Sequence, residues 1–73
     1  MFVNVQYLKL KTESGMRVFG GREYTYETDF NLRVGDVVIV PAGDSDNEVA
    51  KVTEVNVARP TFKCKKVKGF EEI

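Results

Sequence analysis

Two tyrosines and a run of basic residues are the side chains of this chain whose types and spacing could do chemistry. Tyr24 and Tyr26 alternate in a short segment flanked by Arg22 and Arg33. Proteins that bind single-stranded nucleic acid combine aromatic faces, on which bases stack, with basic groups that hold the backbone. Tyrosine on a half-buried strand is also a common core residue with its hydroxyl at the rim. The pair therefore predicts either a stacking platform or a part of the core.

The basic run lies between Arg59 and Lys68 and contains no acidic residue. On a strand, Lys63 and Lys65 would project from the same face about 7 Å apart, close to the phosphate spacing of a single strand. The same lysines could instead keep an exposed edge strand from aggregating. The candidate nucleic-acid contacts are Arg22, Tyr24, Tyr26, Arg33, Arg59, Lys63, Lys65 and Lys66.

No residue pattern supports catalysis, a cofactor or a metal site. The chain has no histidine and one cysteine, Cys64, which excludes imidazole-based mechanisms, an internal disulfide and a Cys/His zinc site. Asp44, Asp46 and Glu48 alternate like the start of a calcium loop, but the glycine and distal glutamate of an EF-hand are missing. We therefore expect a protein that is not an enzyme and has no cofactor and no metal.

Composition predicts one small folded domain over residues 1–73. Apolar residues make up 42% of the chain, and eleven basic residues balance eleven acidic ones, so the overall field does not steer polyanions. The N-terminus has no basic region ahead of an apolar core, and no apolar run approaches the roughly 18 residues of a membrane span. We expect no membrane association and a location in the cytoplasm of a bacterial or phage-infected cell.

Turns and apolar runs predict a sheet of short strands. Residues 37–40 are all β-branched, which suits a strand covered on both faces that Pro41 ends, and residues 41–47 suit a mobile polar loop. A change of phase predicts a bulge or a sharp bend at Tyr7 and Leu8, and a bulge or strong coiling near Lys51. The remaining expected strands are 2–10, 16–19, 24–28, 48–56 and 61–67, the last with Phe62 and Cys64 on its inner face.

This pattern predicts an all-β fold. We expect a small five-stranded antiparallel barrel of SH3-like type, with an oligonucleotide-binding-type barrel as the alternative. No segment has a convincing helical period, and internal repeats are absent.

Two motifs resemble a known family. They are Tyr24-Thr25-Tyr26 and Leu32-x-Val34-Gly35-Asp36-x-Val38-x-Val40-Pro41-x-Gly43, followed by a valine-rich strand. Over about half of the chain they resemble the N-terminal DNA-binding domain of the primosomal replication-restart helicase family. The resemblance implies a small barrel that captures the end of a nascent DNA strand at a fork. The family usually has an acidic residue where this chain has Thr25. The same motifs are similar to small stand-alone proteins of tailed bacteriophages.

These observations leave three functions open. The first is a non-enzymatic module that binds single-stranded or forked DNA. The second is a phage-encoded protein-interaction module that binds and modulates a host replication or transcription enzyme, as the zero net charge, the small size and the acids of residues 44–48 suggest. The third is a structural subunit that pairs through an exposed sheet edge. The chain is accordingly expected to be a monomer or a small homo-oligomer.

Overall fold

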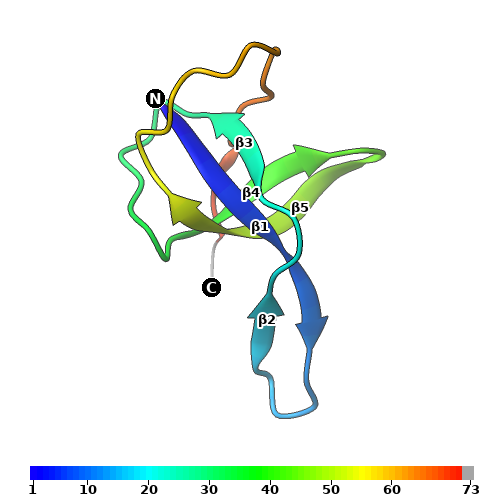
Figure 1. Ribbon diagram of the computed structural model, residues 1–73. Helices are drawn as coiled ribbons and strands as arrows, with labels where there is room; N and C mark the ends of the chain where they lie inside the picture. The colour runs from blue at the N-terminus through cyan, green and yellow to red at the C-terminus, as the bar shows by residue number, and fades with distance from the viewer. Residues whose placement is uncertain (72–73) are drawn as a thin grey trace.

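The computed structural model describes residues 1–71 and shows an all-β chain (Figure 1). Its antiparallel sheet confirms the expected fold class, with six strands in place of five. No helix long and apolar enough to cross a membrane occurs among the described residues. The strands are β1 (Phe2–Lys11), β2 (Arg17–Phe19), β3 (Tyr24–Glu27), β4 (Val37–Ala42), β5 (Ser45–Glu54) and β6 (Gly69–Phe70).

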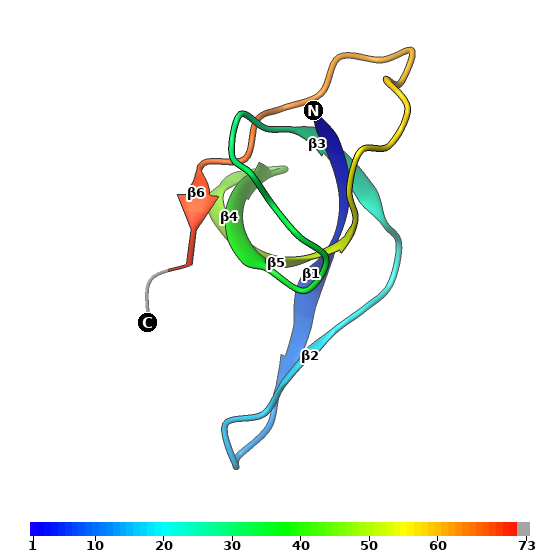
Figure 2. The same cartoon turned by 90° about the vertical axis from the view of Figure 1, so that its left-hand side faces the viewer.

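The long strand β1 organises the sheet. The order is β2-β1-β5-β4-β6, and β3 also pairs with β1. The first half of β1 lies between β3 and β5, which both pair with Val5, whereas its last residues pair with β2 alone. The hairpin of β4 and β5 curls strongly, which Figure 2 shows in a view along the resulting ring.

The core forms where the alternating residues of three strands point inward. Val3 and Val5 of β1 face Val38 and Val40 of β4, and all four side chains are completely buried. Because strand side chains alternate between faces, this pattern places Val37 and Ile39 on the other side, where they stay half-buried. The strand expected to be covered on both faces is fully covered on the face of Val38 and Val40 and partly covered on the other. The other core residues are Tyr26, Leu32, Ala50, Val52 and Val67.

The sheet does not close into a barrel in the described part of the chain, because residues 61–67 form no strand. Only an isolated parallel bridge joins Lys66 to Glu27. The Glu27 amide donates to the Lys65 carbonyl at 3.0 Å, and the Val67 amide donates to the Glu27 carbonyl at 2.9 Å. The expected final strand over residues 61–67 is thus wrong. The chain joins the sheet again at Gly69, where β6 pairs with the edge of β4.

A tight turn replaces the polar loop expected over residues 41–47. β4 continues to Ala42 and β5 starts at Ser45, so that only Gly43 and Asp44 connect them. Gly43 has a φ of 55°, which favours glycine. Pro41 lies within β4, at a register shift between Val40 and Ala42 where the ladder is irregular and its missing donor is tolerated.

Both expected bulges occur, each a little further along the chain. The register of β1 with β2 shifts between Leu8 and Leu10. The register of β1 with β5 passes from Val52 to Glu54, so that Thr53 is the extra residue. The buried face of β5 consists of Ala50 and Val52.

Candidate nucleic-acid interface

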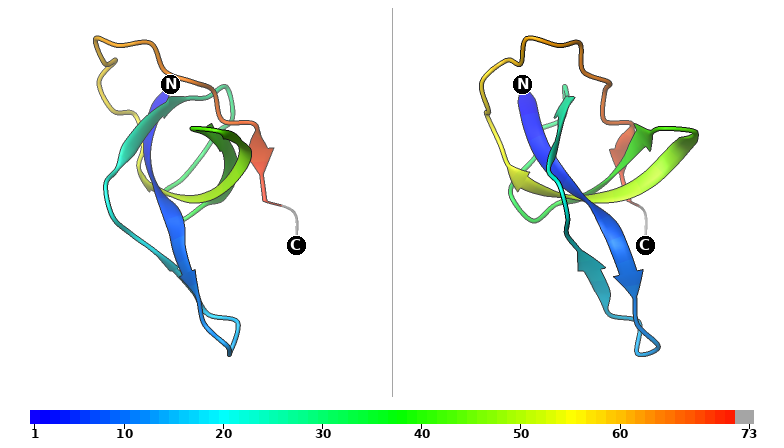
Figure 3. Two further views of the ribbon diagram at one scale, coloured as in Figure 1. Left: turned by 90° about the vertical axis from the view of Figure 1, so that its right-hand side faces the viewer. Right: turned by 45° about the vertical axis from the view of Figure 1, so that its right-hand side comes forward.

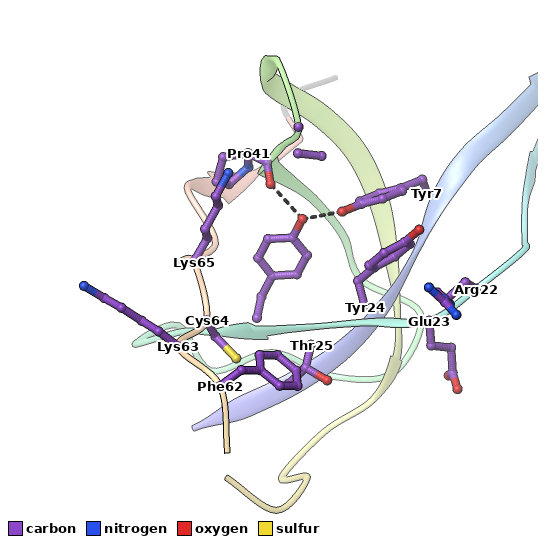
Figure 4. A pocket seen from close by; sticks show the side chains of 13 residues that line it. Tyr7, Arg22, Glu23, Tyr24, Thr25, Pro41, Phe62, Lys63, Cys64 and Lys65 are labelled. Carbon is purple, nitrogen blue, oxygen red and sulfur yellow. Dashed lines mark hydrogen bonds between the residues drawn. The ribbon is translucent and has the colours of Figure 1, made fainter. Parts of the chain in front are cut away.

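A cleft of about 540 Å³ lies beside β3 (Figure 4). Its walls come from four parts of the chain that are distant in sequence. They are Tyr7 of β1, residues 22–26 at β3, residues 41–43 at the β4–β5 turn, and residues 62–65. We call this feature the Tyr24 cleft.

Three tyrosines connected by contacts and hydrogen bonds form its floor. The rings of Tyr7 and Tyr24 stack with their centroids 4.7 Å apart and an interplanar angle of 22°. The Tyr26 hydroxyl donates to the Pro41 carbonyl at 2.7 Å, so the Tyr7 hydroxyl is the donor in its own bond to Tyr26. Because Pro41 has no backbone N–H, its carbonyl is the one backbone group with which it can form a hydrogen bond. The floor is therefore fixed to both β1 and β4.

Tyr26 belongs to the core and does not offer a free ring face. Its side chain is only 5% exposed. Burial raises the pKa of the Tyr26 hydroxyl above its ordinary value. The hydrogen bond from Tyr7 and the charge of Tyr7 raise this pKa further. The hydroxyl is consequently neutral at physiological pH.

Tyr24 and Phe62 are the rings that a ligand can reach. Tyr7 covers one face of Tyr24, which is nevertheless 40% exposed, and Phe62 is 62% exposed. Figure 4 shows Phe62 next to Thr25 below the tyrosines. Phe62 was expected on the inner face of a strand, and its exposure overturns that expectation because residues 61–67 are not a strand. The exposed rings can accept stacked bases.

Three exposed cations surround these rings. Arg22 lies on one side of the cleft, and Lys63 and Lys65 lie on the opposite wall (Figure 4). Neither of the ion pairs seen in residues 1–71 involves any of these three side chains. Glu23 is the acidic residue of the lining, and its carboxylate accepts the Thr53 hydroxyl proton at 2.5 Å. With three cations against one anion, the cleft is positively charged.

The other predicted contacts lie outside this cleft. The Arg33 amide donates to the Asp36 carboxylate at 2.8 Å in the turn before β4. Arg59 lines an adjoining hollow that shares Phe62, Lys63 and Cys64 with the Tyr24 cleft. Lys66 forms an ion pair with Asp29 at 3.5 Å. The structure therefore brings five of the eight sequence candidates together, namely Arg22, Tyr24, Tyr26, Lys63 and Lys65.

Sequence reasoning missed Tyr7 and Phe62 as parts of the site. Tyr7 alternates in phase with Val3 and Val5, which marks it as facing the core. The same orientation lets its ring stack on Tyr24. Cys64 is half-buried in the same wall, where burial and the charge of Glu27 raise the pKa of its thiol. The thiol therefore stays protonated at neutral pH.

Comparisons of the chain with known proteins found no matching family model, no matching curated protein and no matching solved structure. Within residues 1–71, no three His, Cys, Asp or Glu side chains are placed so that they could hold a metal ion.

Proposed function

We propose that this chain binds single-stranded or forked DNA at the Tyr24 cleft and has no enzymatic activity. The observation that supports this function is the placement of two exposed rings, Tyr24 and Phe62, in one cleft among three cations that form no ion pair within residues 1–71. Base stacking on an aromatic side chain contributes about 1–3 kcal/mol per base. The cations supply the salt-dependent attraction to phosphates.

The cleft favours unpaired bases over duplex. A base can stack on Tyr24 only when its own face is free, which holds in a single strand or at a strand end and not inside a helix. The lysines on one wall and Arg22 on the other would contact the backbone on both sides of such a base. The resemblance to the primosomal family supports the same ligand. We also propose that the curled sheet is an open relative of the SH3-like barrel.

Fluorescence anisotropy tests this function with labelled single-stranded, forked and blunt duplex oligonucleotides at low salt. We expect micromolar affinity for the first two, with blunt duplex weaker. Because three cations face the strand, the logarithm of the binding constant should fall with the logarithm of salt concentration with a slope of about −2. Absence of binding up to high micromolar protein would defeat the proposal.

A matched pair of variants checks the location. Lys65→Gln removes a cation from the cleft, whereas Lys66→Gln removes its neighbour, which pairs with Asp29 outside the cleft. Weaker binding in the first variant alone supports the Tyr24 cleft as the site. Equal loss in both variants would assign binding to the basic run as a whole.

A protein-interaction module is the second candidate function. Leu10, Met16 and Val18, which are 58%, 66% and 42% exposed, favour it because such exposed apolar groups mark protein contacts. They lie at a distance from the Tyr24 cleft, whose lining contains none of them. The two functions can therefore coexist in one molecule.

A further inference from the structure

The β1–β2 hairpin extends away from the rest of the sheet as an arm. Figure 3 shows its two strands and their connecting turn projecting beyond the curled hairpin of β4 and β5. We call residues 8–19 the β1–β2 arm. β5 pairs with β1 only from Asn4 to Tyr7, so within residues 1–71 the second edge of β1 has no strand partner in the arm.

One face of the arm is apolar and uncovered. Leu10 and Val18 are direct partners across the two strands and therefore point to the same side. Met16 is two positions from Val18 and is even more exposed. An isolated two-stranded ribbon is only marginally stable in water and gains from a third strand. The arm thus combines an open edge with an apolar face that lacks a cover.

The opposite face is basic and already holds a carboxylate. Lys11 and Arg17 are cross-strand partners on this side. The Arg17 guanidinium donates to a Glu71 carboxylate oxygen at 2.7 Å and lies 5.6 Å from the centre of the Phe19 ring. Lys51 of β5 approaches the same ring at 5.9 Å. Within residues 1–71, Glu71 is the acidic side chain paired with these cations, so Lys11, Arg17 and Lys51 face one described carboxylate.

We propose that the β1–β2 arm docks an extended segment of a protein partner in which apolar and acidic side chains alternate. A segment that adds to a sheet edge keeps the two-residue period of strands. Its apolar side chains would then cover Leu10 and Val18, while its carboxylates would face Lys11 on the other side. The Arg17 contact with Glu71 shows that this face accepts carboxylates.

A second copy of the chain fits this arm less well. Pairing two identical arms along the open edge would place Lys11 of one copy near the lysines of the other on a shared face, and like charges in such positions are destabilising. Duplex DNA would use the basic face and leave Leu10 and Val18 uncovered. An acidic and apolar segment satisfies both faces at once.

The test is an NMR titration of the ¹⁵N-labelled full chain. The probe is a synthetic peptide of about eight residues, long enough for one strand, that alternates valine and glutamate. A matched control peptide has lysine in place of glutamate. We expect amide shifts concentrated at residues 8–11 and 16–19, and affinity for the control peptide lower by about tenfold.

A variant separates docking from folding. Leu10→Lys combined with Val18→Lys changes two exposed side chains, so the core shifts in the spectrum should persist while peptide binding is lost. Shifts centred on the Tyr24 cleft, equal binding of both peptides, or no arm shifts at millimolar peptide would each overturn the proposal. Light scattering is a further test. A dimer of the original chain that is absent in the double variant would also overturn the proposal, because the arm would then be an interface between copies.

Discussion

The two halves of β1 share an alternating pattern of apolar residues but lie in opposite surroundings. In the first half, Val3 and Val5 are completely buried, because β3 and β5 flank this part of the strand on both edges. In the second half, Leu10 is 58% exposed beside β2 alone. The number of neighbouring strands, more than the apolar residues themselves, decides which half becomes core.

This difference also divides the proposed functions. The first half ends in Tyr7, which holds Tyr24 and Tyr26 in fixed positions under the cleft. The second half carries an open edge that can accept another strand. A rigid site suits the recognition of a rigid base, and an open edge suits a flexible peptide.

The largest expected effect is on folding. Val5→Ala leaves a cavity in the completely buried half of β1 and should lower the free energy of unfolding by about 2 kcal/mol. Leu10→Ala in the arm should change it by less than about 0.5 kcal/mol. Urea unfolding of both variants measures the contrast. Equal losses in the two variants would show that the arm is as well packed as the core.

The next effect is on stacking. Tyr24→Ala should weaken binding of single-stranded DNA by about 1–3 kcal/mol, because the reachable ring of the cleft floor is lost. Tyr24→Phe keeps the ring and should bind within about twofold of the original chain. Anisotropy titrations at one salt concentration compare them. If alanine and phenylalanine behave alike, Tyr24 is not a stacking platform.

A smaller effect is expected from the cations. Lys63→Gln combined with Lys65→Gln should reduce the salt-dependence slope by about 1.4, since two of three phosphate contacts are removed. Lys9→Gln combined with Lys11→Gln removes two exposed lysines of the arm and should leave the slope unchanged. Titrations over a series of salt concentrations give both slopes. A reduced slope in the arm variant would merge the two regions into one DNA-binding surface.

The smallest effect concerns alkaline pH. The unfolded chain loses the Tyr26 proton near the ordinary pKa of 10.0, whereas the folded chain keeps it to higher pH because burial raises the pKa. Stability is therefore complete below pH 10 and falls above it, by at most about 1.4 kcal/mol per pH unit from this group. Denaturant unfolding at pH 8, 10 and 11 measures the decline. In the Tyr26→Phe variant, stability should decline less steeply with rising pH. If the decline is as steep as in the original chain, other titrating groups cause it.

Sequence patterns were sufficient for the strands whose alternation matches burial. Val3, Val5, Val38 and Val40 alternate regularly, and the strands that contain them are found within a few residues of their expected bounds. The irregularities in β1 and β5 also lie within about three residues of their expected positions, as is usual for element boundaries.

Long-range pairing decided what the sequence could not show. The segment around Phe62 and Cys64 alternates like a strand, but a strand requires a continuous partner. In the part of the chain that the structure describes, residues 61–67 are bridged to a strand at one position, between Lys66 and Glu27. Of the eight candidate contacts, five line the cleft because β3 lies beside this segment, whereas Arg33 and Lys66 do not line it and Arg59 lines the adjoining hollow. No local pattern predicts that arrangement.

The attachment of Lys65 and Val67 to Glu27 has a consequence for the motions of the molecule. This wall of the cleft is tied to β3 by the backbone bonds of one residue and continues into β6, which is only two residues long. Breaking these few bonds would release the wall as a strap and expose Val67, which belongs to the core, while Val3, Val5, Val38 and Val40 stay buried between their strands. The amide protons of Glu27 and Val67 should then exchange with solvent deuterium together and sooner than those of Val5, and the width of the opening can adjust to what enters it.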